Sequence, residues 1–290
     1  MTAGFDKYKR DRTKMRIGLV PMSAKPYHAG HHMLVQFAAG LRVTEAAQTL
    51  ALPENDVVGV FISYSGRGTK SVKDPSDPRP LTKGGRKIEV PAPGETPVFG
   101  ADMKYIWTNL LKPNLDLPSS VKLLTPDDGV NPAPVQNVHR VCEALKAAYD
   151  EGRETFTVPY LNVTARVDET VISIYSDSVD IVGNYPDSEM TAMYGDLWAS
   201  VGADCEAPCI QGVGIPRTAT VEISGTKMRN MLCAGDIESF SALLPPLPDD
   251  VKREIGTVLS QSIAAGCPLE RRGSKVQTEA LLRALIRSIL

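Results

Sequence analysis

The chain has 290 residues, of which 42% are hydrophobic and 23% charged. This composition excludes low-complexity and collagen-like classes and allows a full hydrophobic core. The formal net charge is −2, so there is no basic excess and we expect no nucleic acid partner. No apolar run approaches the length of a membrane span, so we expect no membrane association.

Residues 1–14 are polar and charged and lack the apolar core of a secretory signal, so we predict a flexible tail. Cys205 and Cys209 have the spacing of half a metal site, but no second Cys/His pair follows, so ordinary thiols are the better interpretation. An odd number of cysteines at irregular spacing suits a reduced, cytoplasmic protein. The five cysteines are Cys142, Cys205, Cys209, Cys233 and Cys267.

The folded part begins with the apolar run Ile17–Val20, which predicts a short buried strand. After a loop come His28, Gly30 and His31, at the start of a segment whose apolar residues recur at helical spacing through Leu41. A helix N-terminus offers backbone N–H groups and a positive dipole end, both of which favour phosphate. Glycine there lets a ligand approach the backbone. Each histidine alone would be an ordinary loop residue, but their placement together favours a phosphate-binding turn.

A continuous apolar run at residues 57–62 predicts a strand buried on both faces. The next segment, residues 65–98, is a Gly/Pro-rich insertion in which no long element is expected. Two interpretations stay open: a solvated surface insertion, or a mobile lid whose cations meet phosphates. The cations are Lys70, Lys73, Arg79, Lys83, Arg86 and Lys87.

The rest of the chain alternates between predicted helices and strands. Periodicity predicts helices at 100–111 and 138–149, and a third that follows Asp187 and is capped by it. Apolar runs predict strands at 121–125, 171–175 and 219–223, and a strand or edge hairpin at 156–163. This alternation indicates a parallel α/β sheet with right-handed crossovers. Ligands bind such sheets outside the carboxyl ends of the strands. We therefore expect the His28–His31 loop, the loops at Asp127 and Asp177, and the segment after residue 223 to meet in one site.

The segment Ile223-Ser224-Gly225-Thr226-Lys227-Met228-Arg229 predicts a second helix start. Ser224 is a natural N-cap, Gly235 ends the helix, and Asp236 can cap the next one. Ser224 could act only as a cap and Arg229 only as a solvated charge. However, two hydroxyls and an arginine beside a helix N-terminus are also a suitable cradle for polyphosphate.

The two motifs resemble those of one enzyme superfamily. Pro26-Tyr27-His28-Ala29-Gly30-His31 after a strand is similar to the HxGH signature of nucleotidylyltransferases, in a form most like the PFHxGH of nicotinamide-nucleotide adenylyltransferases. The run from Ile223 to Arg229 resembles their ISxTxxR signature in its ISGT form. The resemblance implies a Rossmann-like nucleotidyltransferase domain over residues 15–245. Residues 246–290 then form a helical C-terminal extension that could pack on the domain or make a homo-oligomer contact.

The resemblance also implies an activity. The enzyme would transfer AMP from ATP to a phosphate-bearing acceptor and release pyrophosphate, with Mg²⁺ assisting and no protein nucleophile. His28 and His31 would contact the triphosphate, Arg229 would hold the β- and γ-phosphates, and Ser224, Gly225 and Thr226 would bind phosphate oxygens. Gly30 would allow close approach, and Lys25 in the preceding loop would add charge. Nicotinamide mononucleotide, which gives NAD, is the leading acceptor.

Other functions remain open. The loop Met22-Ser23-Ala24-Lys25 differs from the usual Gly-Arg-Phe-Gln of the nicotinamide branch, which leaves the acceptor undetermined. A cytidylyltransferase, or an adenylyltransferase for phosphopantetheine, FMN or sulfate, would belong to the same class. A class I aminoacyl-tRNA-synthetase-like enzyme shares the HxGH loop but would need a KMSKS run, which this sequence lacks. A non-catalytic nucleotide-binding module is the alternative from another class.

Overall fold

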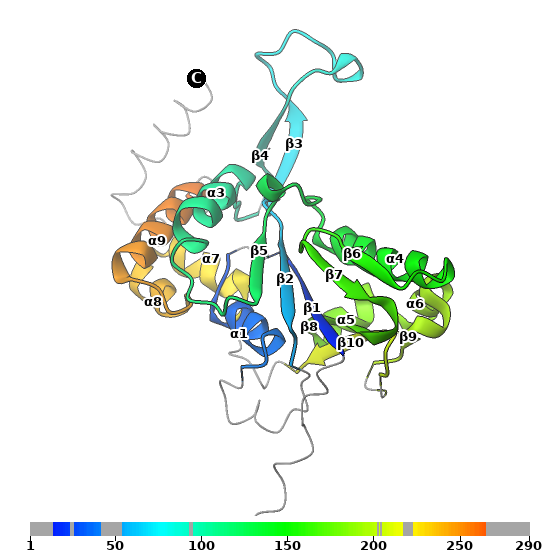
Figure 1. The fold of residues 1–290 in the computed structure, drawn as a ribbon. Helices are drawn as coiled ribbons and strands as arrows, with labels where there is room; N and C mark the ends of the chain where they lie inside the picture. The colour runs from blue at the N-terminus through cyan, green and yellow to red at the C-terminus, as the bar shows by residue number, and fades with distance from the viewer. Residues whose placement is uncertain are drawn as a thin grey trace, which may run out of the picture. The chain divides into compact units, whose positions relative to one another are not determined.

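A six-stranded sheet, parallel throughout, organises one half of the protein in the computed structural model (Figure 1). The described residues are 14–23, 26–41, 54–92, 95–201, 203, 205–216 and 223–264. The strand order is β5-β2-β1-β8-β10-β9. The strands are β1 (Met15–Met22), β2 (Val57–Ile62), β5 (Val121–Leu124), β8 (Thr170–Asp177), β9 (Trp198–Ala199) and β10 (Cys209–Ile215).

The strand order reverses beside β1, because β2 and β5 follow on one side and β8 begins the other. Such a reversal is the topological switch point at which doubly wound sheets bind ligands. Numbered along the chain, the strands of this sheet run 3-2-1-4-6-5, which keeps the 3-2-1-4 part of the Rossmann order and exchanges the last two strands. The predicted α/β class is therefore confirmed. In register, Ile17 of β1 lies beside Val57 of β2 and Ile172 of β8. All six residues of β2 are buried, as its unbroken apolar sequence predicts.

Helices cover this sheet through apolar stripes. Helix α4 (Pro134–Asp150) packs on β1 and β2 and buries Val138, Val141 and Leu145 in the same core. Helix α5 (Ser178–Asn184) packs on β8 and β10, and α6 (Asp187–Tyr194) packs on α4 and β9. The alternation of helix and strand predicted from periodicity thus holds for the elements that build this core.

The chain forms two compact units. The first takes its described residues from Met1–Met22, Met33–Ile62 and Leu117–Thr220, and it contains the whole sheet. The second takes them from Ser23–His32, Ser63–Asp116 and Val221–Leu290. Helix α1 (Ala29–Ala38) begins in the second unit and continues in the first.

The second unit is mainly helical. Helices α7, α8 and α9 pack on one another, and α9 also contacts α3 and the π-helical segment that continues it. Of the predicted tail and extension, residues 1–13 and 265–290 lie outside the described residues. The helices are α3 (Gly100–Tyr105), the π segment (Ile106–Leu111), α7 (Gly225–Cys233), α8 (Ile237–Ala242) and α9 (Asp249–Ile263).

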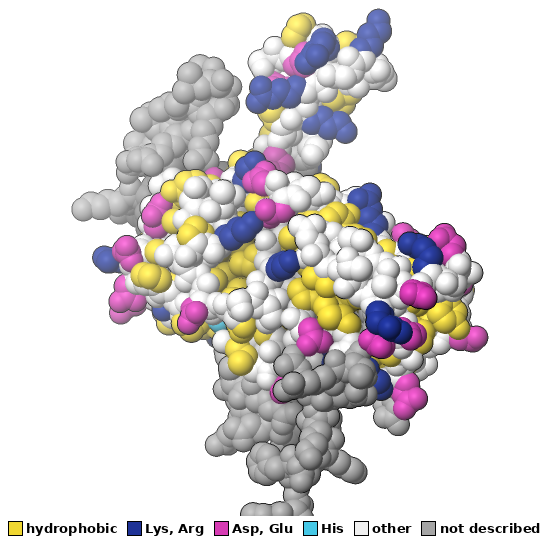
Figure 2. All heavy atoms as spheres, viewed as in Figure 1, with side chains coloured by type: hydrophobic (Ala, Val, Ile, Leu, Met, Phe, Trp, Pro, Cys, Tyr) yellow, Lys and Arg dark blue, Asp and Glu magenta, His cyan; other side chains and the backbone are white. Residues whose placement is uncertain are grey.

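The basic insertion contains an antiparallel hairpin of β3 (Thr69–Lys73) and β4 (Lys87–Pro91) (Figure 1). Its tip is ordered by two buried carboxylates: Asp77 accepts bonds from the Arg79 side chain and the Arg86 backbone, and Asp74 pairs with the Arg86 side chain. These two carboxylates are buried whereas the cations of the insertion are exposed, and Figure 2 shows Lys and Arg side chains on the surface of the hairpin. At the hairpin base, Glu89 accepts from Thr69 Oγ1 and from the Gly100 backbone N–H that starts α3.

Several connections are short. Strands β6 (Thr155–Val158) and β7 (Val163–Arg166) form a hairpin, one of the two expectations for this segment, but as a separate two-stranded sheet and not at the edge of the six-stranded sheet. The remaining short helices are 3₁₀ turns at Leu81–Lys83, Pro126–Asp128, Val167–Glu169 and Gly195–Leu197. No helix within the described ranges is both long and apolar enough to span a membrane.

Two expectations about local structure need correction. Strand β10, which follows the short strand β9 after α6, is not among the predicted strands, because its glycines hide it in the sequence: a Cβ at Gly212 or Gly214 would lie 3.2 Å from Ile181 of α5. The strand predicted at 219–223 falls on residues 219–222, which lie outside the described residues, and Ile223, which is not in a strand. Asp187 does not cap α6; it is the first residue of the helix and accepts from Trp198 Nε1 at 3.0 Å.

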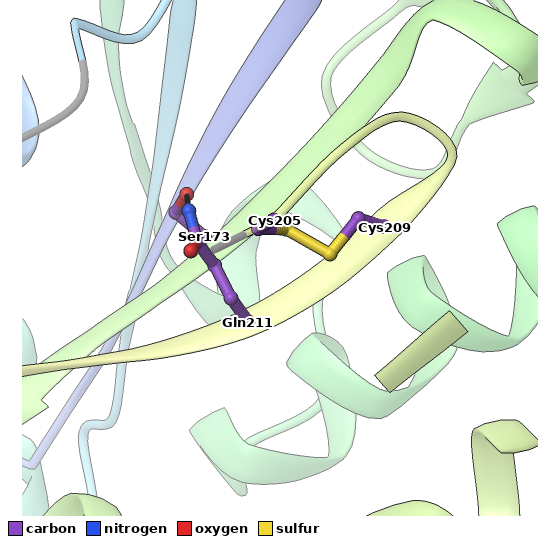
Figure 3. The surroundings of a disulfide bond; sticks show 4 residues. All are labelled: Ser173, Cys205, Cys209 and Gln211. Carbon is purple, nitrogen blue, oxygen red and sulfur yellow. Dashed lines mark hydrogen bonds between the residues drawn. A yellow bond between two sulfur atoms is a disulfide. The ribbon is translucent and has the colours of Figure 1, made fainter. Parts of the chain in front are cut away.

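Cys205 and Cys209 form a disulfide, which corrects the expectation of ordinary thiols (Figure 3). The backbone before β10 brings their Cα atoms to 5.9 Å, within the range a disulfide needs. Two residues further on, Gln211 Nε2 donates to Ser173 Oγ of β8 at 2.9 Å. The disulfide therefore closes a small ring directly before the strand that pairs with β8.

Candidate functional site

The histidines of the first motif form a close pair at the start of α1. The ring centroids of His28 and His31 lie 3.8 Å apart with the planes tilted by 33°. His28 is 7% exposed, and Gly30 between the two histidines is buried. The Nδ1 atom of each ring is buried and has no hydrogen-bond partner in the described part of the chain. Such atoms are costly, about 1–3 kcal/mol each, so adjacent ones suggest a place for a ligand.

Both rings are held neutral by their surroundings. Burial lowers the pKa of His28 to about 4. Burial, and then the charge of His28, lowers the pKa of His31 well below its ordinary value. Near pH 7 each ring therefore carries one N–H and one acceptor nitrogen. An anion brought to the pair would favour the protonated form of both rings.

Three side chains that were not assigned a role from the sequence surround this pair. Tyr27, which is 2% exposed, stacks on His31 with centroids 5.8 Å apart and meets Trp107 edge-on at 4.9 Å. The Tyr27 hydroxyl lies 3.3 Å from Nδ1 of His32, which is itself buried. Burial lowers the pKa of His32, and the Asp116 carboxylate opposes this effect.

The second motif is a capped helix start, as predicted. Ser224 Oγ accepts from the Lys227 N–H at 3.0 Å, and α7 begins at Gly225. Thr226 Oγ1 accepts from Arg229 Nη2 at 3.0 Å. Ser224 and Thr226 are exposed whereas Arg229 is buried. Since both hydroxyls act as acceptors within the protein, each keeps its own O–H to donate to an anion.

A second cation lies near Arg229. Burial lowers the pKa of Arg229, Arg67 lowers it further, and Glu95 opposes them. Arg67 comes from the base of the β3–β4 hairpin, where its backbone exchanges two bonds of 2.8 Å with Val98. The hairpin base thus adds a positive charge beside the second motif, and this cation was not among the residues predicted from the sequence.

The two motifs belong to the same unit. The Ala29 N–H at the start of α1 donates to the Leu243 carbonyl at 2.9 Å, directly after α8. Helix α8 packs on α7, which carries Thr226 and Arg229. Helix α8 therefore links the histidine pair to the second motif, while Lys25 lies outside the described residues.

The aspartates of the other strand-end loops have local structural roles. Asp177 caps α5 by accepting from the Val179 N–H at 2.9 Å. Asp128, next to Asp127, forms a capping box with Thr125. Both loops belong to the first unit. Within the described ranges, no group of three or more His, Cys, Asp and Glu side chains is arranged to hold a metal ion.

Comparison with known proteins found no family model that matches the sequence and no curated protein with significant similarity.

Proposed function

We propose that the protein is a nucleotidyltransferase that transfers AMP from MgATP to a phosphate-bearing acceptor and releases pyrophosphate. The observation that carries the proposal is the His28–His31 pair: two neutral imidazoles 3.8 Å apart whose buried Nδ1 atoms lack partners among the described residues. The resemblance of both motifs to those of nucleotidylyltransferases supports the same function. Nicotinamide mononucleotide is the leading acceptor, and the product would be NAD.

In this proposal an acceptor phosphate oxygen attacks the α-phosphorus of ATP. The bond from the α-phosphorus to the bridging oxygen breaks, and pyrophosphate leaves with that electron pair. No protein nucleophile is required, so catalysis comes from positioning and from stabilising charge as it develops. His28 and His31 donate N–H groups to oxygens around the α-phosphorus, where the burial of His28 strengthens such an interaction.

The second motif holds the leaving group. Arg229, with Arg67 nearby, presents positive charge to the β- and γ-phosphates, and the hydroxyls of Ser224 and Thr226 donate to their oxygens. Mg²⁺ enters as part of the MgATP substrate. None of the proposed site side chains is a carboxylate, the group through which proteins usually hold Mg²⁺, so no step is assigned to a protein-bound metal. The proposal also includes a cytoplasmic location. The Cys205–Cys209 disulfide argues against that location, because disulfides are rare in the reducing cytosol.

The test is a screen of ATP and CTP against a panel of acceptors, with pyrophosphate as the readout. The panel includes nicotinamide mononucleotide, phosphopantetheine, FMN and sulfate. NAD formation from ATP would support the leading acceptor, and turnover of another acceptor would keep the class and change the substrate. ATP binding without pyrophosphate release from any pair would favour a non-catalytic module.

A further inference from the structure

Tyr27 is buried among the histidines of the first motif, and its ring contacts residues from two elements. It stacks on the His31 imidazole with an interplanar angle of 12° and meets Trp107 edge-on at 62°. Its edge contact with His32 places the ring centroids 6.3 Å apart. A buried aromatic residue in such contacts has little freedom to rotate, so it can fix the orientation of its neighbours.

Trp107 supports the Tyr27 ring from the π-helical segment. It is fully buried, and its carbonyl accepts from the Lys112 N–H at 3.0 Å, five residues along the chain. Wide turns of this kind are uncommon and often occur at functional sites. The indole Nε1 is buried without a hydrogen-bond partner among the described residues. The position of Trp107 is therefore not set by a hydrogen bond of its indole, and its edge contact with Tyr27 is part of the apolar packing around it.

The Tyr27 hydroxyl serves a different neighbour from the ring. Burial raises the pKa of Tyr27, so the hydroxyl stays protonated, and it forms a hydrogen bond with Nδ1 of His32 at 3.3 Å. The hydroxyl thus orients His32 while the ring face contacts His31, so the two effects can be separated by substitution.

The His31 ring needs such a contact. The final torsion of a histidine side chain is broad, and a functional imidazole is usually oriented by a hydrogen bond at one ring nitrogen. Nδ1 of His31 has no such bond in the described part of the protein. Its ring contacts are the stack on Tyr27 and the tilted contact with His28.

We propose that Tyr27 is a positioning residue, which holds the His31 imidazole in the plane required for nucleotidyl transfer while Trp107 fixes the Tyr27 ring. This inference rests on the proposed function. It assigns to the Tyr27 ring the orienting role that a hydrogen bond plays in other sites.

The test compares Tyr27→Phe, which keeps the ring, with Tyr27→Met, which keeps an apolar side chain and loses the aromatic face. Tyr27→Phe should retain kcat within about threefold. Tyr27→Met should lower kcat by about 10- to 100-fold, the range expected for a misplaced catalytic group, with KM for MgATP changed by less than about threefold. The matched control is Tyr194→Met in the first unit, where Tyr194 stacks on His139 with centroids 6.2 Å apart; it should leave kcat unchanged.

A double-mutant cycle with His31→Ala decides whether Tyr27 acts through His31. Tyr27→Met should cause no further loss in the His31→Ala background; a full additional loss would overturn the inference. NMR contacts between the Tyr27 and His31 rings in the wild-type protein provide a second test that does not require Tyr27→Met to fold, and their absence would also overturn it. A wild-type protein that releases no pyrophosphate would refute the proposed function, and this inference with it.

Discussion

Lowering the pH should destabilise the protein through His28 before most carboxylates titrate. The pKa of His28 falls from 6.5 to about 4 on folding, so between these values the unfolded chain binds a proton that the folded protein does not. Stability is then fully present above pH 6.5 and is lost as the pH falls toward 4. At about 1.4 kcal/mol per pH unit, the loss from His28 is about 3 kcal/mol. His31 adds to it in the same direction.

Urea denaturation at pH 7, 6, 5 and 4 measures this loss. The two tryptophans lie in different units, so a Trp198→Phe background leaves Trp107 as the reporter beside Tyr27 and the histidine pair. In that background His28→Asn should lose about 3 kcal/mol less stability than the parent between pH 7 and pH 4. Comparison of the two proteins cancels the carboxylates that begin to titrate near pH 4.

His139→Gln is the matched control, because His139 is a half-buried histidine of the first unit. It should leave most of the pH dependence reported by Trp107 in place. Equal pH dependence in His28→Asn and its parent would refute the reasoning, since it would mean that His28 is solvated or partnered and titrates near its ordinary pKa.

Three further predictions concern the site and the hairpin. His31→Ala should lower kcat by about 100- to 1000-fold with little change in KM for MgATP, and its melting temperature should stay close to that of the wild type; easy unfolding in a thermal scan would instead mark His31 as structural. Arg229→Lys keeps the charge and loses the planar fork, so steady-state kinetics should give a KM for MgATP about tenfold higher; an unchanged KM would remove Arg229 from the phosphate site. If the hairpin acts as a lid, limited proteolysis should cut residues 70–87 in the free protein and spare them with an ATP analogue and Mg²⁺; equal cutting would contradict the lid.

The parts of the fold that could be predicted from the sequence are those where burial alone determines the residue pattern. Strand β2 is buried on both faces and therefore reads as an unbroken apolar run. Strand β10 was missed because α5 packs closely against it and leaves no room for a side chain at Gly212 or Gly214. The hairpin in the insertion was missed because β3 has a single apolar residue and no apolar alternation, and its tip is ordered by Asp74 and Asp77 rather than by apolar contacts.

In the site, too, the features set by a short segment could be predicted from the sequence, whereas contacts between distant segments could not. The histidines of the first motif and the Ser224 cap could be identified from short segments because the backbone geometry at a helix start is local. Tyr27 lay inside the first motif, but its role depends on Trp107, 80 positions further along the chain in the printed sequence. Arg67 approaches Arg229 only through the pairing of Arg67 with Val98. Such contacts form only in the folded chain, so they cannot be identified from the order and spacing of residues in the sequence.

In the proposed reaction the acceptor attacks the α-phosphorus of ATP beside His28 and His31. Parallel reactions with ATP labelled at the α- or the γ-phosphate, using the acceptor identified by the screen, show which phosphorus is attacked. We expect the α-label in the acceptor product and the γ-label in pyrophosphate at equal rates, with both rates reduced together in His31→Ala. Release of the γ-label as inorganic phosphate, or its transfer to the acceptor, would instead place the attack at the γ-phosphorus.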